Sequence, residues 1–373
     1  MKRELVHRFR DPNAARAVAA AIHARSTRPA RLMEFCGGHT HAILHFGIPD
    51  LLPPTVELRS GPGCPVCVTA AADLDRAIAM SGVDGAILTT FGDMIRVPGS
   101  RVAGRAATLA QARAAGADVR VVYSPLDALR IAQQNPQRPV IFLGVGFETT
   151  APTVASTVLA AEAAGVDNFF VFSSHKLTPP ATRAILDSGK VALDGIIGPG
   201  HVTTVIGADA WRFLADEYHM PVAVAGFEPL DILRAILALV EMIEAGRAGV
   251  DNAYTRSVQP AGNTAAQQAL TQVMAVRDVE WRGLGIVPAS GLAFGAAYTR
   301  FDAGRAFPLD LPPAREPAGC RCGDVLRGVI RPPECPLFAR GCSPENPVGP
   351  CMVSAEGACA AHYQYGASIG GDR

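Results

Sequence analysis

The sequence predicts an α/β protein in which parallel sheets are flanked by helices, followed by a cysteine-rich segment. Six short apolar runs, rich in β-branched or aromatic residues, recur through the middle of the chain. The stretches between these runs are alanine-rich and amphipathic, and from about residue 301 prolines and cysteines replace the apolar periodicity. Strands that alternate with helices imply parallel strands joined by helical crossovers.

Each apolar run is short enough to form a buried strand of a parallel sheet. In chain order the runs are 83–90, 118–124, 138–145, 167–173, 194–198 and 220–226. The segment 230–245 is the clearest of the intervening helical patterns, because its apolar residues recur at helical spacing.

Polar loops that contain glycine or proline follow nearly every predicted strand. In open α/β sheets the ligand crevice lies outside the carboxyl ends of the strands. We therefore expect these loops to line one cleft together. The polar residues just past the strands are Asp93, Glu148, His175, His201 and Glu228. Any single one of them could equally be structural.

The predicted division of the chain has four parts. Residues 1–56 form an N-terminal segment that carries a CGGHTH motif, and residues 57–150 form an α/β domain that carries a C-x-x-C motif. Residues 151–300 form a second α/β domain, and residues 301–373 form a cysteine-rich domain. The last part has too little apolar periodicity for an ordinary core, so a metal cluster is expected to hold it together.

The balanced charge of the chain excludes partners that are recruited by the electrostatic field of a strongly charged protein. Lys+Arg and Asp+Glu both number 34, so no net charge draws the chain to nucleic acid or an acidic membrane surface. No run of about 18 apolar residues predicts a membrane span. Residues 13–24 resemble a transit peptide, but the nearby Glu4 and Asp11 favour an amphipathic surface helix. We expect a cytoplasmic protein.

The nine cysteines are grouped at the two ends of the chain. Three lie within residues 36–67 and six within residues 320–359. An odd number in a large chain with its own core argues against a secreted disulfide framework.

The first signature is CGGHTH, from Cys36 to His41. The two glycines permit unusual backbone angles and the close approach of a ligand. Thr40 is expected to cap a short helix that begins with AILHF. Because Cys36 has His39 and His41 beside it, we favour a functional site over a buried thiol next to capping residues.

The second signature is GPGCPVC, followed by the helical pattern VTAAADLDRAIAM. Cys64 is expected near the helix N-cap with Pro65 in the first helical position, and Cys67 on the same side of the first turn. A helix N-terminus lowers the pKa of a thiol. The pair can bind a metal or close reversibly to a disulfide.

The third group lies in the C-terminal segment. Cys335, Cys342, Cys351 and Cys359 are separated by six, eight and seven residues, without the C-x₂₋₄-C knuckles of zinc sites. Four spread thiolates suit a [4Fe–4S] cluster better than zinc, and structural disulfides come last in a reducing compartment. The remaining two, Cys320 and Cys322, form a redox pair, or Cys322 replaces one of the four ligands.

These signatures together resemble those of the HypD family of hydrogenase maturation proteins. The matching segments are FCGGHTH (35–41), GPGCPVC (61–67), TTFGDMIRVPGS (89–100), GVGFETTAP (144–152), SSHKLTPPA (173–181), GPGHVTTVIG (198–207), CRCGDVLRG (320–328) and ECPLFARGCSPENPVGPCMVSAEGACAA (334–361). They follow one another over most of the chain, with no departure at a cysteine.

The resemblance implies a fold, a function and partners. The fold is two Rossmann-like parallel-sheet domains plus a small iron–sulfur cluster domain. The function is a scaffold that works with a small HypC-type chaperone and a HypE-type cyanide donor. On this scaffold iron gains cyanide and carbon monoxide, as Fe(CN)₂CO, before delivery to a [NiFe] hydrogenase large subunit. Cys36, Cys64 and Cys67 are then the iron-site cysteines, and tail cysteines bind a [4Fe–4S] cluster.

Our hypothesis is that Cys36 anchors the iron, with a HypC cysteine on its other side, while Cys64 and Cys67 change redox state beside it. His39 and His41 either donate hydrogen bonds to cyanide and tune Cys36, or serve in capping and packing. This is an assembly scaffold with possible redox activity. The alternatives are a cluster-dependent disulfide reductase acting on a protein partner and a zinc-stabilised binding protein.

Overall fold

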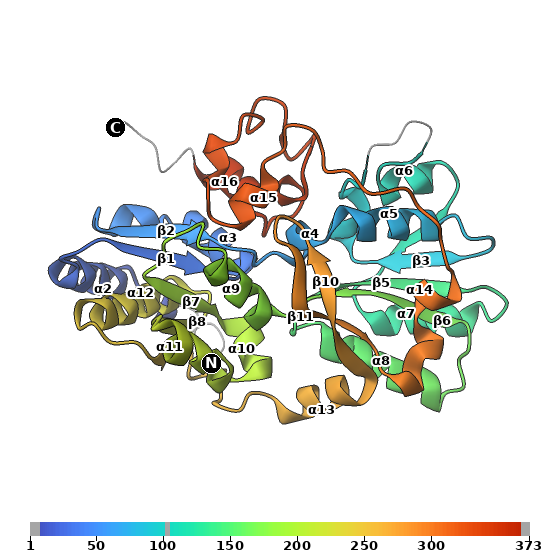
Figure 1. The fold of residues 1–373 in the computed structure, drawn as a ribbon, viewed down its shortest axis with the longest axis horizontal. Coiled ribbons are helices and arrows are strands. Elements are labelled where there is room, and N and C mark those ends of the chain that lie inside the picture. Colours follow the sequence, from blue (N-terminus) through green and yellow to red (C-terminus); the bar gives the residue numbers. More distant parts are fainter. Residues whose placement is uncertain (1–7, 101–104, 367–373) are drawn as a thin grey trace.

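The computed structural model describes residues 8–100 and 105–366, and in them the strands form two parallel sheets and one antiparallel hairpin. Figure 1 shows the two sheets side by side, with the C-terminal segment above the place where they meet. The predicted α/β class with parallel sheets is confirmed. Each of the six predicted runs overlaps a strand, and three of the strands extend one or two residues past the predicted end.

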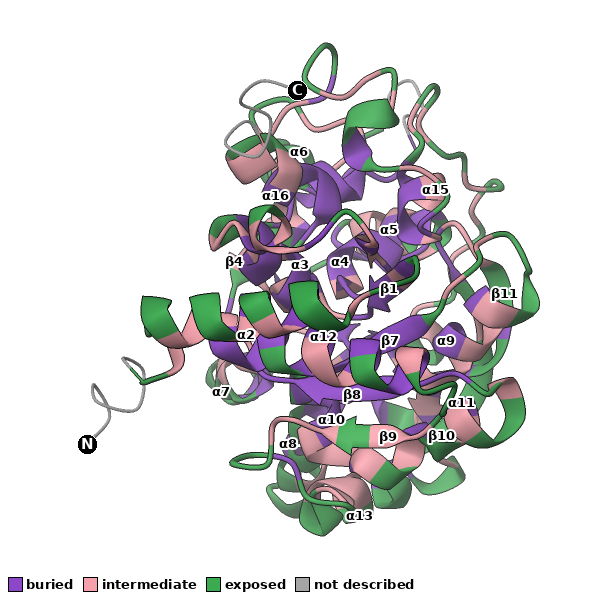
Figure 2. Cartoon of the chain, turned by 90° about the vertical axis from the view of Figure 1, so that its left-hand side faces the viewer, coloured by how far each residue is buried: buried purple, intermediate pink, exposed green. Residues whose placement is uncertain are grey.

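The first sheet has five strands in the order β2-β1-β7-β8-β9, all parallel. Its strands are β1 (Ala30–Glu34), β2 (Val56–Ser60), β7 (Gly195–Pro199), β8 (Val222–Ala225) and β9 (Val250–Asn252). Its helices are α2 (Pro12–Arg25), α3 (Gly37–His45), α10 (Gly200–Ile206), α11 (Arg212–Tyr218) and α12 (Pro229–Glu244). Figure 2 shows the buried strands β7 and β8 beneath helices whose outer faces are exposed.

The second sheet has four parallel strands in the order β4-β3-β5-β6. They are β3 (Ile87–Thr90), β4 (Asp118–Val121), β5 (Val140–Gly146) and β6 (Phe169–His175). All seven residues of β5 are buried, as expected for a central strand covered on both faces. The helices here are α5 (Ala71–Met80), α6 (Leu109–Ala114), α7 (Pro125–Gln134) and α8 (Ala151–Ala163). Helix α9 (Thr178–Asp187) follows β6, contacts β11 (Gly285–Phe294) and lies beside β7 of the first sheet.

An antiparallel hairpin, which the sequence did not predict, closes the carboxyl edge of the second sheet. It consists of β10 (Met274–Trp281) and β11 (Gly285–Phe294), and it follows helix α13 (Thr264–Val273). The amide of Leu177 donates to the Ser290 carbonyl at 2.8 Å, just past β6. The single cleft predicted along all the strand ends is therefore wrong, because this hairpin occupies part of that edge.

The cysteine-rich segment has short helices and much irregular backbone. Helix α14 (Ala303–Ala306) precedes a proline-containing stretch, after which come α15 (Cys322–Leu326), two 3₁₀ helices (Pro332–Glu334 and Pro350–Met352) and α16 (Ala358–Tyr365). Helix α16 packs on α3, and the 3₁₀ helix at Pro350–Met352 packs on α4 (Pro65–Val68). The segment thus sits on the two N-terminal cysteine motifs.

The sheets divide the chain differently from the predicted ranges. The chain leaves the first sheet after β2, builds the whole second sheet, and returns to the first sheet at β7. The predicted boundary after residue 150 falls between β5 and β6, which are hydrogen-bonded neighbours. The strands β1 and β2, placed in a separate N-terminal segment by the sequence, pair with each other and with β7.

The first described helix, α2, packs on α12 and buries Ile22 completely. This agrees with the amphipathic helix favoured for residues 13–24. Within residues 8–100 and 105–366, no helix has both the length and the apolar composition that crossing a membrane requires.

Candidate functional site

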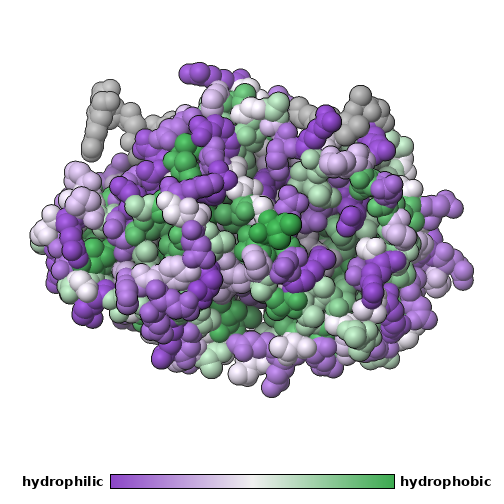
Figure 3. Space-filling model, viewed as in Figure 1, coloured by the Kyte–Doolittle hydropathy of each residue, from purple (hydrophilic) through white to green (hydrophobic). Residues whose placement is uncertain are grey.

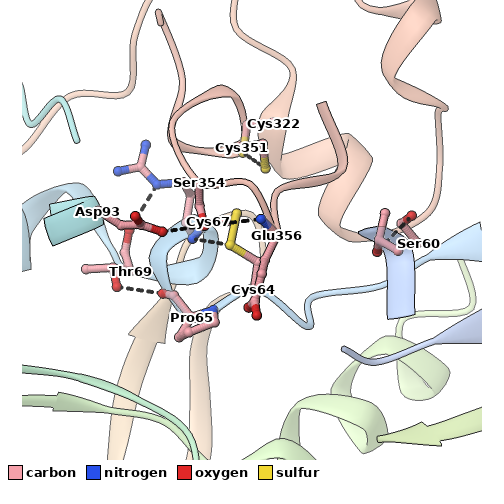
Figure 4. The surroundings of a disulfide bond; sticks show 12 residues. Ser60, Cys64, Pro65, Cys67, Thr69, Asp93, Cys322, Cys351, Ser354 and Glu356 are labelled. Carbon is pink, nitrogen blue, oxygen red and sulfur yellow. Dashed lines mark hydrogen bonds between the residues drawn. A yellow bond between two sulfur atoms is a disulfide. The ribbon is translucent and has the colours of Figure 1, made fainter. Parts of the chain in front are cut away.

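Three parts of the chain that are distant in sequence meet at one place. The loop after β1 carries Cys36, the short helix α4 carries Cys64 and Cys67, and the C-terminal segment lies over both. Figure 4 shows Cys322 and Cys351 above the Cys64–Cys67 pair, with Ser354 and Glu356 beside it. The amino-terminal and carboxyl-terminal cysteine motifs therefore lie next to each other in the fold.

Cys36 is held in place by its backbone. It is the N-cap of α3 in an extended conformation, and its amide donates to Oε2 of Glu34 at 2.7 Å. The next amide, of Gly37, donates to the Gly63 carbonyl at 2.9 Å. A Cβ at Gly63 would collide with the backbone of Cys36. Glycine is therefore required immediately before Cys64, because it lets the two motifs pack backbone to backbone.

Thr40 does not cap the helix as predicted. Helix α3 begins at Gly37, three residues earlier than Thr40, because the two glycines continue the helix from Cys36. The Thr40 hydroxyl instead donates to Oε1 of Glu34. The expected helix start at AILHF is corrected accordingly.

Cys64 and Cys67 form a disulfide in this structure. Cys64 is the N-cap of α4 and Pro65 follows in the first helical position, as predicted. The predicted continuous helix after the motif is wrong, since it breaks at Thr69 and Ala70 before α5. The Thr69 carbonyl accepts from Nε of Arg282 at 3.0 Å, which holds this break against the hairpin.

Both sulfur atoms of the disulfide are enclosed, whereas Cys36 is a free thiol with intermediate exposure. The exposed fractions of Cys64 and Cys67 are 3% and 0%. Burial raises the pKa of the Cys36 thiol to about 12, and the negative charges of Glu356 and Glu34 add to the effect. The Gly38 and His39 amides act in the opposite direction. Cys36 is therefore a protonated thiol at neutral pH, and metal binding has to displace this proton.

Glu34 is a site residue that the sequence analysis missed. It ends β1 with its carboxyl group buried, and burial raises its pKa to about 8 despite the hydrogen bond from Thr40. An acidic residue two positions before a cysteine, at the end of an apolar run, was the available signal. Glu356 is a second such residue, brought next to Gly37 from the C-terminal segment.

The two histidines of the first motif contact different elements. His39 is fully buried, stacks on Phe227 with 4.7 Å between ring centroids, and bonds to the Gly226 carbonyl through Nε2 at 2.9 Å. Burial lowers its pKa to about 4. Its Nδ1 has no hydrogen-bond partner in the described part of the chain. Nε2 of His41 forms a hydrogen bond with the Tyr365 hydroxyl of α16, at 3.1 Å. These contacts suit a packing role for both rings.

The other five polar residues predicted to share a cleft are separated by the fold. Glu148 is buried and accepts from the amide and the hydroxyl of Thr178, both at 2.7 Å. His175 is buried at the end of β6. Asp93 accepts from the Ser354 hydroxyl at 2.8 Å and so lies beside the disulfide.

The remaining two lie near the first motif. The ring of His201 packs on Phe227 with centroids 3.9 Å apart, and Glu228 pairs with Arg10. Phe227 also borders Gly38, because a Cβ there would lie 3.0 Å from its ring. The loop after β8 thus flanks the Cys36 loop, whereas Glu148 and His175 belong to the second sheet.

All six tail cysteines line one cavity of about 20 Å³, together with apolar side chains that include Leu337, Phe338 and Met352. The predicted ligands Cys335, Cys342, Cys351 and Cys359 are among them, and so are Cys320 and Cys322. The Sγ atoms of Cys322 and Cys351 are 2.8 Å apart.

This donor set fits an iron–sulfur cluster, because it is entirely thiol and is surrounded by apolar groups. In the part of the chain that the structure describes, no three His, Cys, Asp or Glu side chains have the arrangement that holds a single metal ion. The hydrogen bond with Cys351 is the main cause that lowers the pKa of the Cys322 thiol, and the positive charge of Arg282 lowers it further.

Comparisons with known proteins agree over nearly the full chain. A family model described as "Hydrogenase formation hypA family", with the short name HypD, matches residues 13–366. The chain is 50% identical over 369 residues to the hydrogenase maturation factor HypD of Azotobacter vinelandii, covering 97% of this chain and 96% of that protein. It is 47% identical over 348 residues to the HypD of Escherichia coli, covering 93% and 92%.

Proposed function

The chain belongs to the HypD family of hydrogenase maturation factors, and from this premise we propose that it holds iron while the cyanide and carbon monoxide ligands of a [NiFe] hydrogenase are attached. Its proposed partners are a HypC-type chaperone and a HypE-type cyanide donor. The hydrogenase large subunit is the indirect recipient.

One observation carries this proposal: the free thiol of Cys36 lies in a loop packed directly on the C-x-x-C turn, beneath the tail cysteines. The amide of Gly37 binds the Gly63 carbonyl, so the two loops cannot separate without breaking this contact. Cys36 retains some exposure, whereas the disulfide sulfurs are enclosed. Of the three N-terminal cysteines, Cys36 is therefore the one that a partner with its own cysteine reaches most readily.

The proposed cargo is an iron atom with soft ligands. Fe(II) that carries cyanide and carbon monoxide prefers thiolates, and Cys36 supplies one once its proton has left. Cys64 and Cys67 can become further thiolate ligands only after two electrons have reduced the disulfide. Their position beside Cys36 supports a role in both iron binding and redox change.

We propose that the tail holds a resident [4Fe–4S] cluster, with Cys335, Cys342, Cys351 and Cys359 as its ligands. Such a cluster supplies single electrons when it is bound. The shared cavity equally accommodates the exchange of one ligand for Cys322, as the sequence left open. Iron and acid-labile sulfide in the purified chain would support the cluster, and zinc in their place would contradict it.

The experiment that tests the iron-holding role replaces Cys36 by alanine. The complex of this variant with its HypC-type partner should lose the iron–cyanide infrared bands, because the anchor of the cargo is gone. The visible iron–sulfur absorbance should remain, since the tail cysteines are unchanged, and this is the internal control. Unchanged infrared bands in the variant would refute the role of Cys36.

The burial of the disulfide disfavours the alternative of a reductase that acts on a protein partner. Thiol–disulfide exchange requires a thiolate to reach one of the sulfurs. Both sulfurs lie under the C-terminal segment, in the same buried cluster of residues as Cys322 and Cys351. A protein disulfide could reach them only if this segment moved away.

A further inference from the structure

A second polar cavity lies away from the cysteine site, between α5, the end of β6, the hairpin and α14. Its volume is about 370 Å³, at the lower end of the range for small-molecule pockets. Neither the cysteines nor the loops that surround Cys36 line it. Figure 1 shows β6 and α14 in the half of the molecule opposite α2, with β10 in the middle of the view.

A buried lysine forms part of the wall of this cavity. Lys176 is 1% exposed, and its Nζ donates to the Glu280 carbonyl at 2.9 Å. The carboxylate of Asp73 lies 3.8 Å away, too far for a strong hydrogen bond. An ammonium group has three donors, so Lys176 retains donor capacity toward the cavity.

Three arginines line the same cavity without an acidic partner. Arg76, Arg277 and Arg305 have no ion pair within the described residues, and Arg277 donates only to the Ser173 carbonyl, at 3.2 Å. They come from α5, β10 and α14, so the tertiary fold alone brings them together. Guanidinium groups present a planar set of donors that matches the oxygens of phosphate and carboxylate groups.

Most of the acidic groups in the wall are already engaged. Asp73 accepts from the Ser174 hydroxyl at 2.8 Å, and Asp278 accepts from the Ala289 amide at 2.8 Å. Asp302 caps α14 through the Gly304 amide, at 2.8 Å. These three carboxylates keep their charges, and with Glu280 they equal the three guanidinium groups and the Lys176 ammonium group in number, so the formal charge of the wall is balanced. Asp73 is the ion-pair partner of Lys176, whereas the three guanidinium groups pair with none of the four carboxylates. The unused donors of the three arginines, and not an excess of positive charge, are therefore what favours an anion in this cavity.

We propose that this cavity binds the phosphate group of a small molecule, with Arg76, Arg277 and Arg305 around the oxygens and Lys176 in the wall. This site is additional to the proposed iron-holding function and does not depend on it. Free phosphate and a phosphate monoester share the chemistry, and they differ in how much of the cavity they fill.

The test is calorimetric titration of the full chain with inorganic phosphate and with glycerol phosphate, at equal ionic strength. We expect saturable binding. A tighter ester would indicate a phosphorylated metabolite, and equal affinities would indicate the free anion. Arg76→Gln and Arg305→Gln should each weaken binding by about tenfold or more, because each removes a charge-assisted hydrogen bond. Both positions are exposed, so the variants should fold normally.

The matched control is Arg212→Gln, an exposed arginine of α11 that pairs with Asp209. It should bind phosphate as the unchanged chain does. Absence of saturable binding with both probes, or an equal loss of affinity in the control, would overturn the proposal.

Discussion

At the scale of single residues, burial decides which groups can act. His39 and His175 are candidates by residue type, yet burial lowers their pKa values to about 4 and 3, so both are neutral at physiological pH. Cys36 is a thiol rather than a thiolate for the same reason. Glu148, expected in a cleft, caps the first turn of α9 instead.

Glu148 gives a prediction for the pH dependence of stability. Burial raises its pKa from 4.5 to about 7, so the folded state keeps a proton that the unfolded state releases. Its contribution is fully present below about pH 4.5 and is lost as the pH rises through 7. Glu148→Gln imitates the protonated form and should therefore gain stability relative to the unchanged chain, by at most about 1.4 kcal/mol per pH unit in this window.

The measurement is urea unfolding of both chains at several pH values between 5 and 7.5. Glu162→Gln, at an exposed position on α8, is the control and should follow the unchanged chain. A constant difference in unfolding free energy between Glu148→Gln and the unchanged chain across this window would contradict the prediction.

At the scale of elements, the turn before α12 connects distant parts of the candidate site. Asp231 in the first turn of α12 is fully buried, is held by both terminal nitrogens of Arg256, and accepts from the Glu228 amide at 3.2 Å. The carbonyl of Gly226 in the same turn accepts from His39 of α3. One ion pair thus fixes a loop that borders the Cys36 helix.

Arg256→Gln should destabilise the protein, because it leaves the buried carboxylate of Asp231 without its cation. We expect a loss on the order of 2 kcal/mol, below that of a fully buried pair because Arg256 is about one-third exposed. Urea unfolding measures the effect, and Arg256→Gln combined with Asp231→Asn should restore part of the loss.

The control for Arg256 is Arg183→Gln, which removes an exposed pair with Glu217 and should cost less than about 1 kcal/mol. Equal losses in the two single variants would show that the Arg256 pair behaves as a surface pair.

At the scale of the whole molecule, the C-terminal segment ties the two sheets together over the cysteine site. Its interior consists of six cysteines with a few apolar side chains, in a cavity of about 20 Å³. The hairpin, in contrast, carries exposed hydrophobic residues, and Ile286 is 74% exposed. Figure 3, viewed as in Figure 1, shows hydrophobic residues in the middle of the molecular face. The proposed cluster would therefore supply much of what holds the C-terminal segment together.

Removing the proposed cluster should loosen this segment selectively. We expect chelation under air to increase proteolytic cleavage within residues 307–350, because little apolar burial remains to hold that stretch. The parallel sheets should resist cleavage, as their strands are buried. Limited proteolysis with mass spectrometry provides the test, and an unchanged cleavage pattern after complete loss of iron would contradict it.

The sequence by itself determined the parallel α/β class, the six strands of the middle region, the three cysteine groups and the family. These follow from local patterns, since apolar runs, glycines and cysteine spacing are visible along the chain. Only the tertiary structure decided how strands β1 and β2 join β7, how the hairpin covers one sheet edge, and that Glu34 lies beside Cys36. Such pairings depend on contacts between residues far apart in the chain, for which local periodicity carries no signal.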